Sequence, residues 1–315
     1  MRAQVWLDVL RGEYLETFIA AGGASVKFLV PATREDGCAI VGELRSMASA
    51  LNYQFAHLDA ASTKLHLADR LFGALAQQVD WDDLARGFVR QLVTARGLRL
   101  PPGEELHIRQ LAAANPTPEA LLRNELRRAI EGDIFHDYAM AQEFRLAMIQ
   151  LCLAQLDPDE DPSLREAVHQ WLWGELRLVS AVKRALIFQK IARHNALAEL
   201  LSLAHWLRRA GRSGLILVLD VARYAQAVRL VERGEGLYYS LPATLDLYEV
   251  LRQLIDACDQ LEGCLVAVLA APEFLTEDRR GLRGYQALYF RVADEVHDRF
   301  QENPLAPLVR IGQGQ

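Results

Sequence analysis

The chain has 315 residues, of which 51% are hydrophobic and 24% charged, as expected for a globular protein with a large core. A net charge of −6 gives no global basic field and argues against a protein that coats nucleic acid non-specifically, although a local arginine patch stays open. The four cysteines lack paired metal-site spacing, and no apolar run approaches the roughly 18 residues of a membrane helix. With no signal-peptide pattern at its start, the chain is expected to be cytoplasmic and to have no membrane contact.

The first 60 residues predict the start of an α/β fold. Residues 1–24 have a helical pattern that closes at Gly22-Gly23, and residues 25–30 predict a strand that Pro31 ends. Apolar positions recur at helical spacing over residues 39–51, so residues 31–38 are predicted as a loop running from a strand into a helix. A phosphate-binding loop would lie there. Residues 53–59 alternate as a second strand and end in Asp59.

Residues 63–210 predict a long helical region. Amphipathic segments cover residues 65–79, 81–96, 119–130 and 138–156, with breaks at proline-containing stretches. Ser163 and Glu166 predict a capping box for the next helix. Residues 196–209 predict a further helix, which Gly211 stops.

The most informative strand is residues 215–219, five consecutive aliphatic residues followed by Asp220. Such a run predicts a strand buried on both faces in the middle of a parallel sheet. Ligands of open α/β sheets bind outside the carboxyl ends of the strands, so Asp220 is a candidate ligand for magnesium if a nucleotide binds. The alternative is a polar residue that simply ends a core strand.

The remaining residues extend the same sheet. A polar loop runs through Gly234 and Gly236, a helix is predicted over residues 244–261, and residues 264–271 predict a second buried strand, which makes a βαβ unit. A basic loop at 279–284, a helix at 287–300 and a short strand-like end follow. The predicted division is a first part of an α/β core at 1–62, a helical insertion at 63–210 and a second part of the core at 211–315.

Several segments resemble the P-loop ATP-binding proteins of bacteriophage-exclusion (BREX) defence systems, which are of the AAA+/STAND type. They are FRLAM at 144–148, RHNA at 193–196, LAHWLR at 203–208, GLILVLD at 214–220, APEF at 271–274 and RRGLRGYQAL at 279–288. The resemblance runs from about residue 26 to 310. It implies a P-loop NTPase-like parallel sheet flanked by helices, with a large helical insertion. Because the chain stops at Gln315, we expect no C-terminal lid.

The chain departs from the nucleotide-binding pattern that the resemblance implies. That family carries Gly-x-x-x-x-Gly-Lys-Ser/Thr after the first strand, whose amides and lysine hold phosphate. The corresponding positions, in order, are Pro31, Asp36, Gly37 and Cys38, and Arg34 lies on the wrong part of the loop to compensate. Asp220 is retained, but Val221 replaces the glutamate that orients water in such ATPases.

These departures predict a non-catalytic ATPase-like scaffold or regulatory subunit of an anti-phage system, with no cofactor. Four arginines at or near the basic loop, Arg279, Arg280, Arg283 and Arg291, are candidates to enter the site of an active ATPase paralogue. The alternative for them is helix capping or pairing with acids on the same surface.

Two other functions stay open. One is an atypical ATP-binding protein, with ATP and magnesium as cofactors, that is active only in a complex. The weaker one is a DNA-binding subunit that uses the basic pairs at 127–128, 183–184 and 208–209. No His-Glu-x-x-His pair or Gly-x-Ser-x-Gly elbow is present, so neither a catalytic zinc site nor a serine hydrolase is expected.

Overall fold

The structure, a computed structural model, describes residues 1–312 except 102, 104, 158–159, 227–236 and 294–302. The chain divides into two compact units. The α/β unit comprises Met1–Leu75 and Ser213–Gln315, and the helical unit comprises Ala76–Arg212. The predicted polar loop through Gly234 and Gly236, and the second half of the helix predicted at 287–300, lie outside the described residues.

The α/β unit contains a five-stranded sheet in which every pair of neighbours is parallel, which confirms the predicted parallel sheet flanked by helices. Its order is β2-β3-β4-β1-β5. The strands are β1 (Ala24–Pro31), β2 (Tyr53–Asp59), β3 (Gly214–Asp220), β4 (Cys264–Leu269) and β5 (Leu308–Ile311). This order matches neither the dinucleotide-binding order 3-2-1-4-5-6 nor the flavodoxin-like order 2-1-3-4-5.

The two aliphatic strands lie where their composition predicts. Every residue of β4 is buried, and in β3 only the terminal Asp220 is partly exposed. Helices cover both faces of a parallel sheet, so its inner strands have no polar face, and a continuous aliphatic run is the result. The helix α11 (Leu241–Asp256) joins β3 to its neighbour β4, which confirms the predicted βαβ unit.

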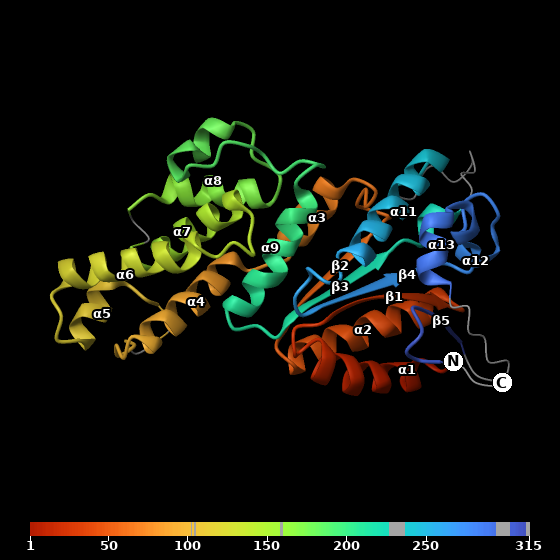
Figure 1. The fold of residues 1–315 in the computed structure, drawn as a ribbon, viewed down its shortest axis with the longest axis horizontal. Helices are drawn as coiled ribbons and strands as arrows, with labels where there is room; N and C mark the ends of the chain where they lie inside the picture. The colour runs from red at the N-terminus through yellow and green to blue at the C-terminus, as the bar shows by residue number, and fades with distance from the viewer. Residues whose placement is uncertain (102, 104, 158–159, 227–236, 294–302, 313–315) are drawn as a thin grey trace. The chain divides into compact units, whose positions relative to one another are not determined.

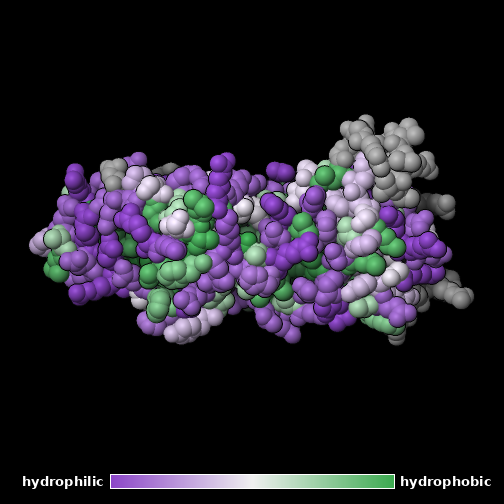
Figure 2. Space-filling view, turned by 90° about the horizontal axis from the view of Figure 1, so that it is seen from above, coloured by the Kyte–Doolittle hydropathy of each residue, from purple (hydrophilic) through white to green (hydrophobic). Residues whose placement is uncertain are grey.

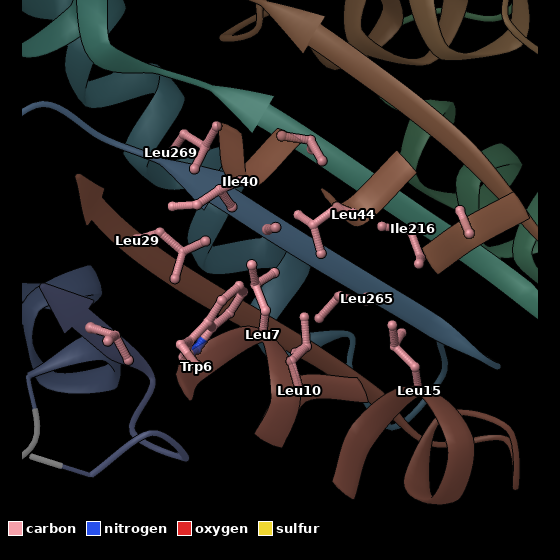
Figure 3. Packing of buried hydrophobic residues seen from close by; sticks show 14 of the residues in the cluster. Trp6, Leu7, Leu10, Leu15, Leu29, Ile40, Leu44, Ile216, Leu265 and Leu269 are labelled. Carbon is pink, nitrogen blue, oxygen red and sulfur yellow. The ribbon is translucent and has the colours of Figure 1, made fainter. Parts of the chain in front are cut away.

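One face of the sheet is covered by α1 (Ala3–Val9), the π-helix η1 (Leu10–Phe18) and α2 (Arg34–Ala50) (Figures 1 and 3). Figure 3 shows Trp6 and Leu7 of α1 pointing toward the strands, together with Ile40 and Leu44 of α2. All four side chains are buried. Their burial, at about 25 cal/mol per Å² of apolar surface, holds these helices on the sheet.

The other face is covered by α11, with α13 (Gln286–Val292) packed against it. Short helices follow β3 and β4, namely α10 (Ala222–Ala225), α12 (Glu273–Thr276) and η4 (Leu282–Gly284). Phe274 of α12 stacks on Phe28 of β1 with ring centroids 5.9 Å apart. This contact fixes the chain after β4 against the neighbouring strand.

The helical unit is built around α7 (Gln142–Leu156), most of whose residues are buried. It packs against α4 (Trp81–Ala95), α6 (Glu119–Phe135) and α8 (Pro162–Leu172). The other elements of this unit are α5 (Ile108–Ala114), η2 (Val179–Ala185) and α9 (Ala196–Arg209). The helix α3 (Ala68–Ala76) belongs to the α/β unit except for its last residue. Hydrophilic residues cover much of the surface seen in Figure 2, and hydrophobic residues gather in restricted areas.

The predicted capping box at the start of α8 is wrong. The N-cap is Asp161, whose carboxylate accepts a hydrogen bond from the Leu164 amide (3.2 Å). Pro162 follows at the first helical position, where its missing N–H costs nothing and its φ suits the helix. This Asp-Pro start therefore begins the helix before Ser163.

Candidate functional site

The carboxyl edge of the sheet is the candidate site, because the order of its strands reverses there. From β1 the chain crosses to β2 at one edge, returns through β3 and β4, and then passes β1 to reach β5. The switch point thus lies between β1 and β4, whose following helices cover opposite faces of the sheet. Ligands of open α/β sheets bind in such a crevice.

The connection after β1 is much shorter than predicted. The strand continues through Pro31, which pairs with Ile311 of β5, and α2 begins at Arg34. Only Ala32 and Thr33 join the two elements, so the predicted loop over residues 31–38 is wrong. Proline is tolerated here because it occupies the last position of its strand, where its missing N–H breaks little of the ladder.

The N-terminus of α2 is capped by its own side chains. Thr33 Oγ1 accepts a hydrogen bond from the Asp36 amide (3.1 Å), and the Thr33 hydroxyl donates to Asp36 Oδ2 (2.9 Å). The Gly37 amide donates to the Thr33 carbonyl (3.3 Å). Glu35 and Asp36 place negative charge beside the positive end of the helix dipole. The Asp36 amide and the helix dipole, which would attract a phosphate, are therefore already engaged by the chain's own groups.

The other predicted positions of this loop lie on the first turns of α2. Gly37 is buried, and a β-carbon built on it would lie 3.5 Å from Pro31 Cγ, an ordinary van der Waals distance. Cys38 is exposed and Arg34 is exposed at the start of the helix. The fold brings Arg34 close enough to Asp220 for its charge to lower the pKa of that carboxyl.

Asp220 ends β3 directly beside Asp59 of β2, its partner in the strand register. Each carboxylate accepts a hydrogen bond from an amide two residues ahead: Ala222 N to Asp220 (3.1 Å) and Ala61 N to Asp59 (2.6 Å). Burial raises the pKa of Asp220, and the Asp59 charge raises it further. The hydrogen bond from the Ala222 amide and the nearby His57 and Arg34 act in the opposite direction and lower the pKa. Both acids therefore act first as caps of their own turns.

Val221 is buried, and its amide donates to the Leu269 carbonyl of β4 (2.8 Å). This position continues the sheet ladder and offers no group that could hold or activate water. Together with the capped start of α2, it means that the residues present do not fit a magnesium–triphosphate group. Among the described residues, moreover, no group of three or more His, Cys, Asp or Glu side chains is placed to hold a metal ion.

The basic loop after α12 is a tightly folded segment. A β-carbon on Gly281 would overlap the Glu277 carbonyl oxygen, and one on Gly284 would lie 2.5 Å from the Arg279 carbonyl oxygen. Only glycine allows the backbone to approach itself this closely. The two glycines of this motif thus fix the course of the loop that carries the arginines.

Two of the four candidate arginines are bound within the unit. Arg280 Nη1 donates to the Tyr239 carbonyl (3.0 Å), and the Arg280 carbonyl accepts from the Tyr248 hydroxyl. Arg291 forms an ion pair with Asp256 of α11, with an Nε–Oδ1 distance of 2.5 Å. Both contacts match the alternative of pairing and capping on the same surface.

Arg279 and Arg283 lie differently. Both side chains are exposed, and neither has a hydrogen bond or ion pair within the part of the chain that the structure describes. Their guanidinium groups thus point from a fixed loop toward solvent.

An aromatic cluster at the same edge was not predicted. Tyr224 and Tyr239 stack with ring centroids 3.7 Å apart, and the His66 ring packs edge-on against both. The Tyr239 hydroxyl donates to the Ala60 carbonyl (2.5 Å), and Tyr224 Oη accepts from the His66 amide (3.0 Å). The cluster joins the segments after β2 and β3. His66 lies 158 residues before Tyr224 in the sequence, so no local pattern could have found the cluster.

In each basic pair considered for DNA binding, one member forms an ion pair within the helical unit, as Arg184 does with Asp161. Arg127 pairs with Glu160 (3.0 Å), and Arg209 pairs with Asp137 (3.4 Å), which also contacts His205 (2.9 Å). None of the described helices combines the length and apolarity needed to cross a membrane.

Comparison with known proteins gives one match. The family model described as BREX system ATP-binding protein BrxC/D matches residues 105–313, more than half of the chain. Searches of curated proteins and of solved structures gave no match. The match covers the later part of the helical unit and β3 to β5, and it leaves out β1, α2 and β2. The resemblance inferred from the sequence is thus confirmed: the chain belongs to the family of BREX-system ATP-binding proteins BrxC/D.

Proposed function

We propose that this chain is a non-catalytic, ATPase-like subunit of a BREX anti-phage system, acting as a scaffold or regulator through contacts with other proteins. The observation that carries the proposal is the connection from β1 to α2. Two residues cannot wrap a triphosphate, and Thr33 and Asp36 occupy the helix end that would bind it. The family match over residues 105–313, which does not include the connection from β1 to α2, supports the proposal.

The chain would act on a partner through Arg279 and Arg283. Their exposure and the close-packed glycines of their loop favour a rigid presentation of two cations at the carboxyl edge. Arginine at such a position stabilises charge on a phosphoryl group during transfer, and it can be supplied by a neighbouring subunit. Arg280 and Arg291, which are held by internal contacts, would position the loop.

The test uses the ATPase activity of a BREX subunit that retains a complete phosphate-binding loop. Adding the wild-type chain should raise its kcat, and the double variant Arg279→Ala/Arg283→Ala should remove most of this increase. Arg11→Ala, which alters an exposed arginine of η1 paired with Glu16, is the matched control and should keep it. Equal stimulation by the wild type and the double variant would refute the role of these arginines.

The alternative is a protein that binds ATP only within a complex. Two observations favour it: the description of the family as ATP-binding, and Asp220, which stands beside Asp59 at the sheet edge within reach of Arg34. Under this alternative, the amount of nucleotide bound by the complex should rise with the amount of this chain that the complex contains. The variant Asp220→Asn should abolish that increase. The proposed function predicts that Asp220→Asn leaves nucleotide binding by the complex unchanged.

A further inference from the structure

Residues 177–190 of the helical unit form a closed surface loop that follows α8 and contains η2. Lys190 Nζ donates to the Arg177 carbonyl (2.8 Å), which joins the two ends of the loop. Trp171 of α8 donates from Nε1 to the Gln189 carbonyl (2.8 Å) and fixes the loop to the helix. Inside it, Val182 and Ile187 are buried. Compact loops with joined ends and their own small core are often functional.

Three large apolar side chains lie on the outside of loop 177–190. Leu178 is 69% exposed, Leu186 57% and Phe188 63%. Figure 2 shows hydrophobic residues gathered on the surface of the helical unit on the side of α8, the helix that loop 177–190 follows. Apolar side chains that gather at a surface mark sites of interaction, because exposing each of them to water is unfavourable and burying it against a partner lowers the free energy.

The backbone at Leu186 is in an unfavourable conformation. Its φ of 62° and ψ of 24° lie in the left-handed region, which bulky side chains rarely adopt. Glycine would occupy this position without strain. Leu186 thus combines a strained backbone with a largely exposed apolar side chain, and strain of this kind is concentrated at functional sites.

The sequence of the loop and its flanks is basic. Residues 176–198 contain five cations and no acid, in a chain whose net charge is −6. The five are Arg177, Lys183, Arg184, Lys190 and Arg193, and all are exposed. Arg184 pairs with Asp161 (2.8 Å). Glu143 of α7 also reaches the loop, where it accepts a hydrogen bond from Gln189 Nε2 (2.8 Å). The loop itself carries cations and no acid, which favours an acidic partner surface over a basic one.

We propose that loop 177–190 docks an acidic segment of another protein, with Leu178, Leu186 and Phe188 entering an apolar site on that partner. Two of the three anchors are aliphatic and offer no face on which a nucleobase could stack, so the composition favours a protein over a nucleic acid. This interaction goes beyond the proposed function, since it lies on the helical unit and needs neither Arg279 nor Arg283. It gives the chain its own means of joining a complex.

The test co-expresses the full chain with the other protein subunits of the same BREX system, purifies the complex and measures the Kd for the subunit retained. Leu178→Asp/Phe188→Asp should weaken binding at least about 30-fold, as expected for two buried anchors. Leu121→Asp, at a residue that is 51% exposed on α6, is the matched control and should leave the Kd unchanged. Arg279→Ala/Arg283→Ala should also leave it unchanged, which separates this proposal from the proposed function.

A second variant excludes misfolding as the cause. Leu186→Gly relieves the backbone strain, so it should raise the unfolding temperature while it weakens partner binding about 10-fold. Partner binding should also weaken with added salt. Equal binding by the loop variants and the wild type would overturn the proposal, as would the absence of any retained subunit. Loss of DNA binding or of self-association, instead of subunit binding, would likewise overturn it.

Discussion

Replacement of Glu199 by glutamine is expected to stabilise the helical unit at neutral pH. Glu199 lies in the first turn of α9 and is only 1% exposed. Its Oε2 has no hydrogen-bond partner among the described residues. Burial, with a smaller contribution from the Glu143 charge, raises its pKa from 4.5 to about 8. The folded unit therefore holds a proton that the unfolded chain has already released at pH 7.

The sign and size of the effect follow from this difference. Below pH 4.5 the carboxyl is protonated in both the folded and the unfolded state, so its ionisation does not change the free energy of unfolding. As pH rises from 4.5 to 8, only the unfolded state loses its proton, so stability falls, by about 3 kcal/mol at pH 7. Glutamine has a similar shape and no proton to lose. Glu199→Gln should thus raise the unfolding temperature at pH 7 by roughly 10 °C.

The assay is thermal unfolding of the wild type and Glu199→Gln between pH 5 and 8.5. The wild type should lose stability with rising pH, and the variant should lose much less. Glu166→Gln changes an exposed glutamate of α8 and serves as the control, which should follow the wild type. A variant with the same pH dependence as the wild type would refute the assignment of a buried, protonated carboxyl.

Three further substitutions test the α/β unit. Lys27 is buried, donates to the Tyr14 hydroxyl (2.7 Å), and has its pKa lowered by burial to about 8. Stability should therefore rise by up to ~3 kcal/mol between pH 8 and 10.5, and Lys27→Met should abolish this rise in urea unfolding. Gly281→Ala places a β-carbon on the Glu277 carbonyl oxygen and should cost about 1–3 kcal/mol. Gly42→Ala, with open space on α2, should instead stabilise by up to ~1 kcal/mol in the same assay.

The buried strands could be predicted because their composition leaves few alternatives. The aliphatic runs of β3 and β4 are too short for separate helices and too apolar for loops, and the structure places them at adjacent positions of the sheet. The end of β1 differs from the prediction by one residue, because the strand includes Pro31 as its last position, where a missing N–H breaks little of the ladder. The pattern of Thr33 followed by Asp36 three residues later does signal a helix start, and it outweighs the loop interpretation.

The site could be predicted only where it depends on local sequence. Asp220 lies at the carboxyl end of its strand as expected. Arg279 and Arg280 are neighbours in sequence but differ in their surroundings. Arg279 is exposed to solvent, whereas Arg280 donates a hydrogen bond to the Tyr239 carbonyl. That difference depends on contacts over some 40 residues, which no local pattern encodes.

The proposed function requires that this chain does not bind a nucleoside triphosphate at the end of β1. Calorimetric titration of the purified protein with Mg-ATP and Mg-ADP tests it most directly, alongside the variant Asp36→Gly/Gly37→Lys/Cys38→Ser, which restores the side chains but not the length of the loop. The account predicts no binding heat up to millimolar nucleotide for either protein. Micromolar binding by the wild type that is lost in Asp220→Ala would contradict it.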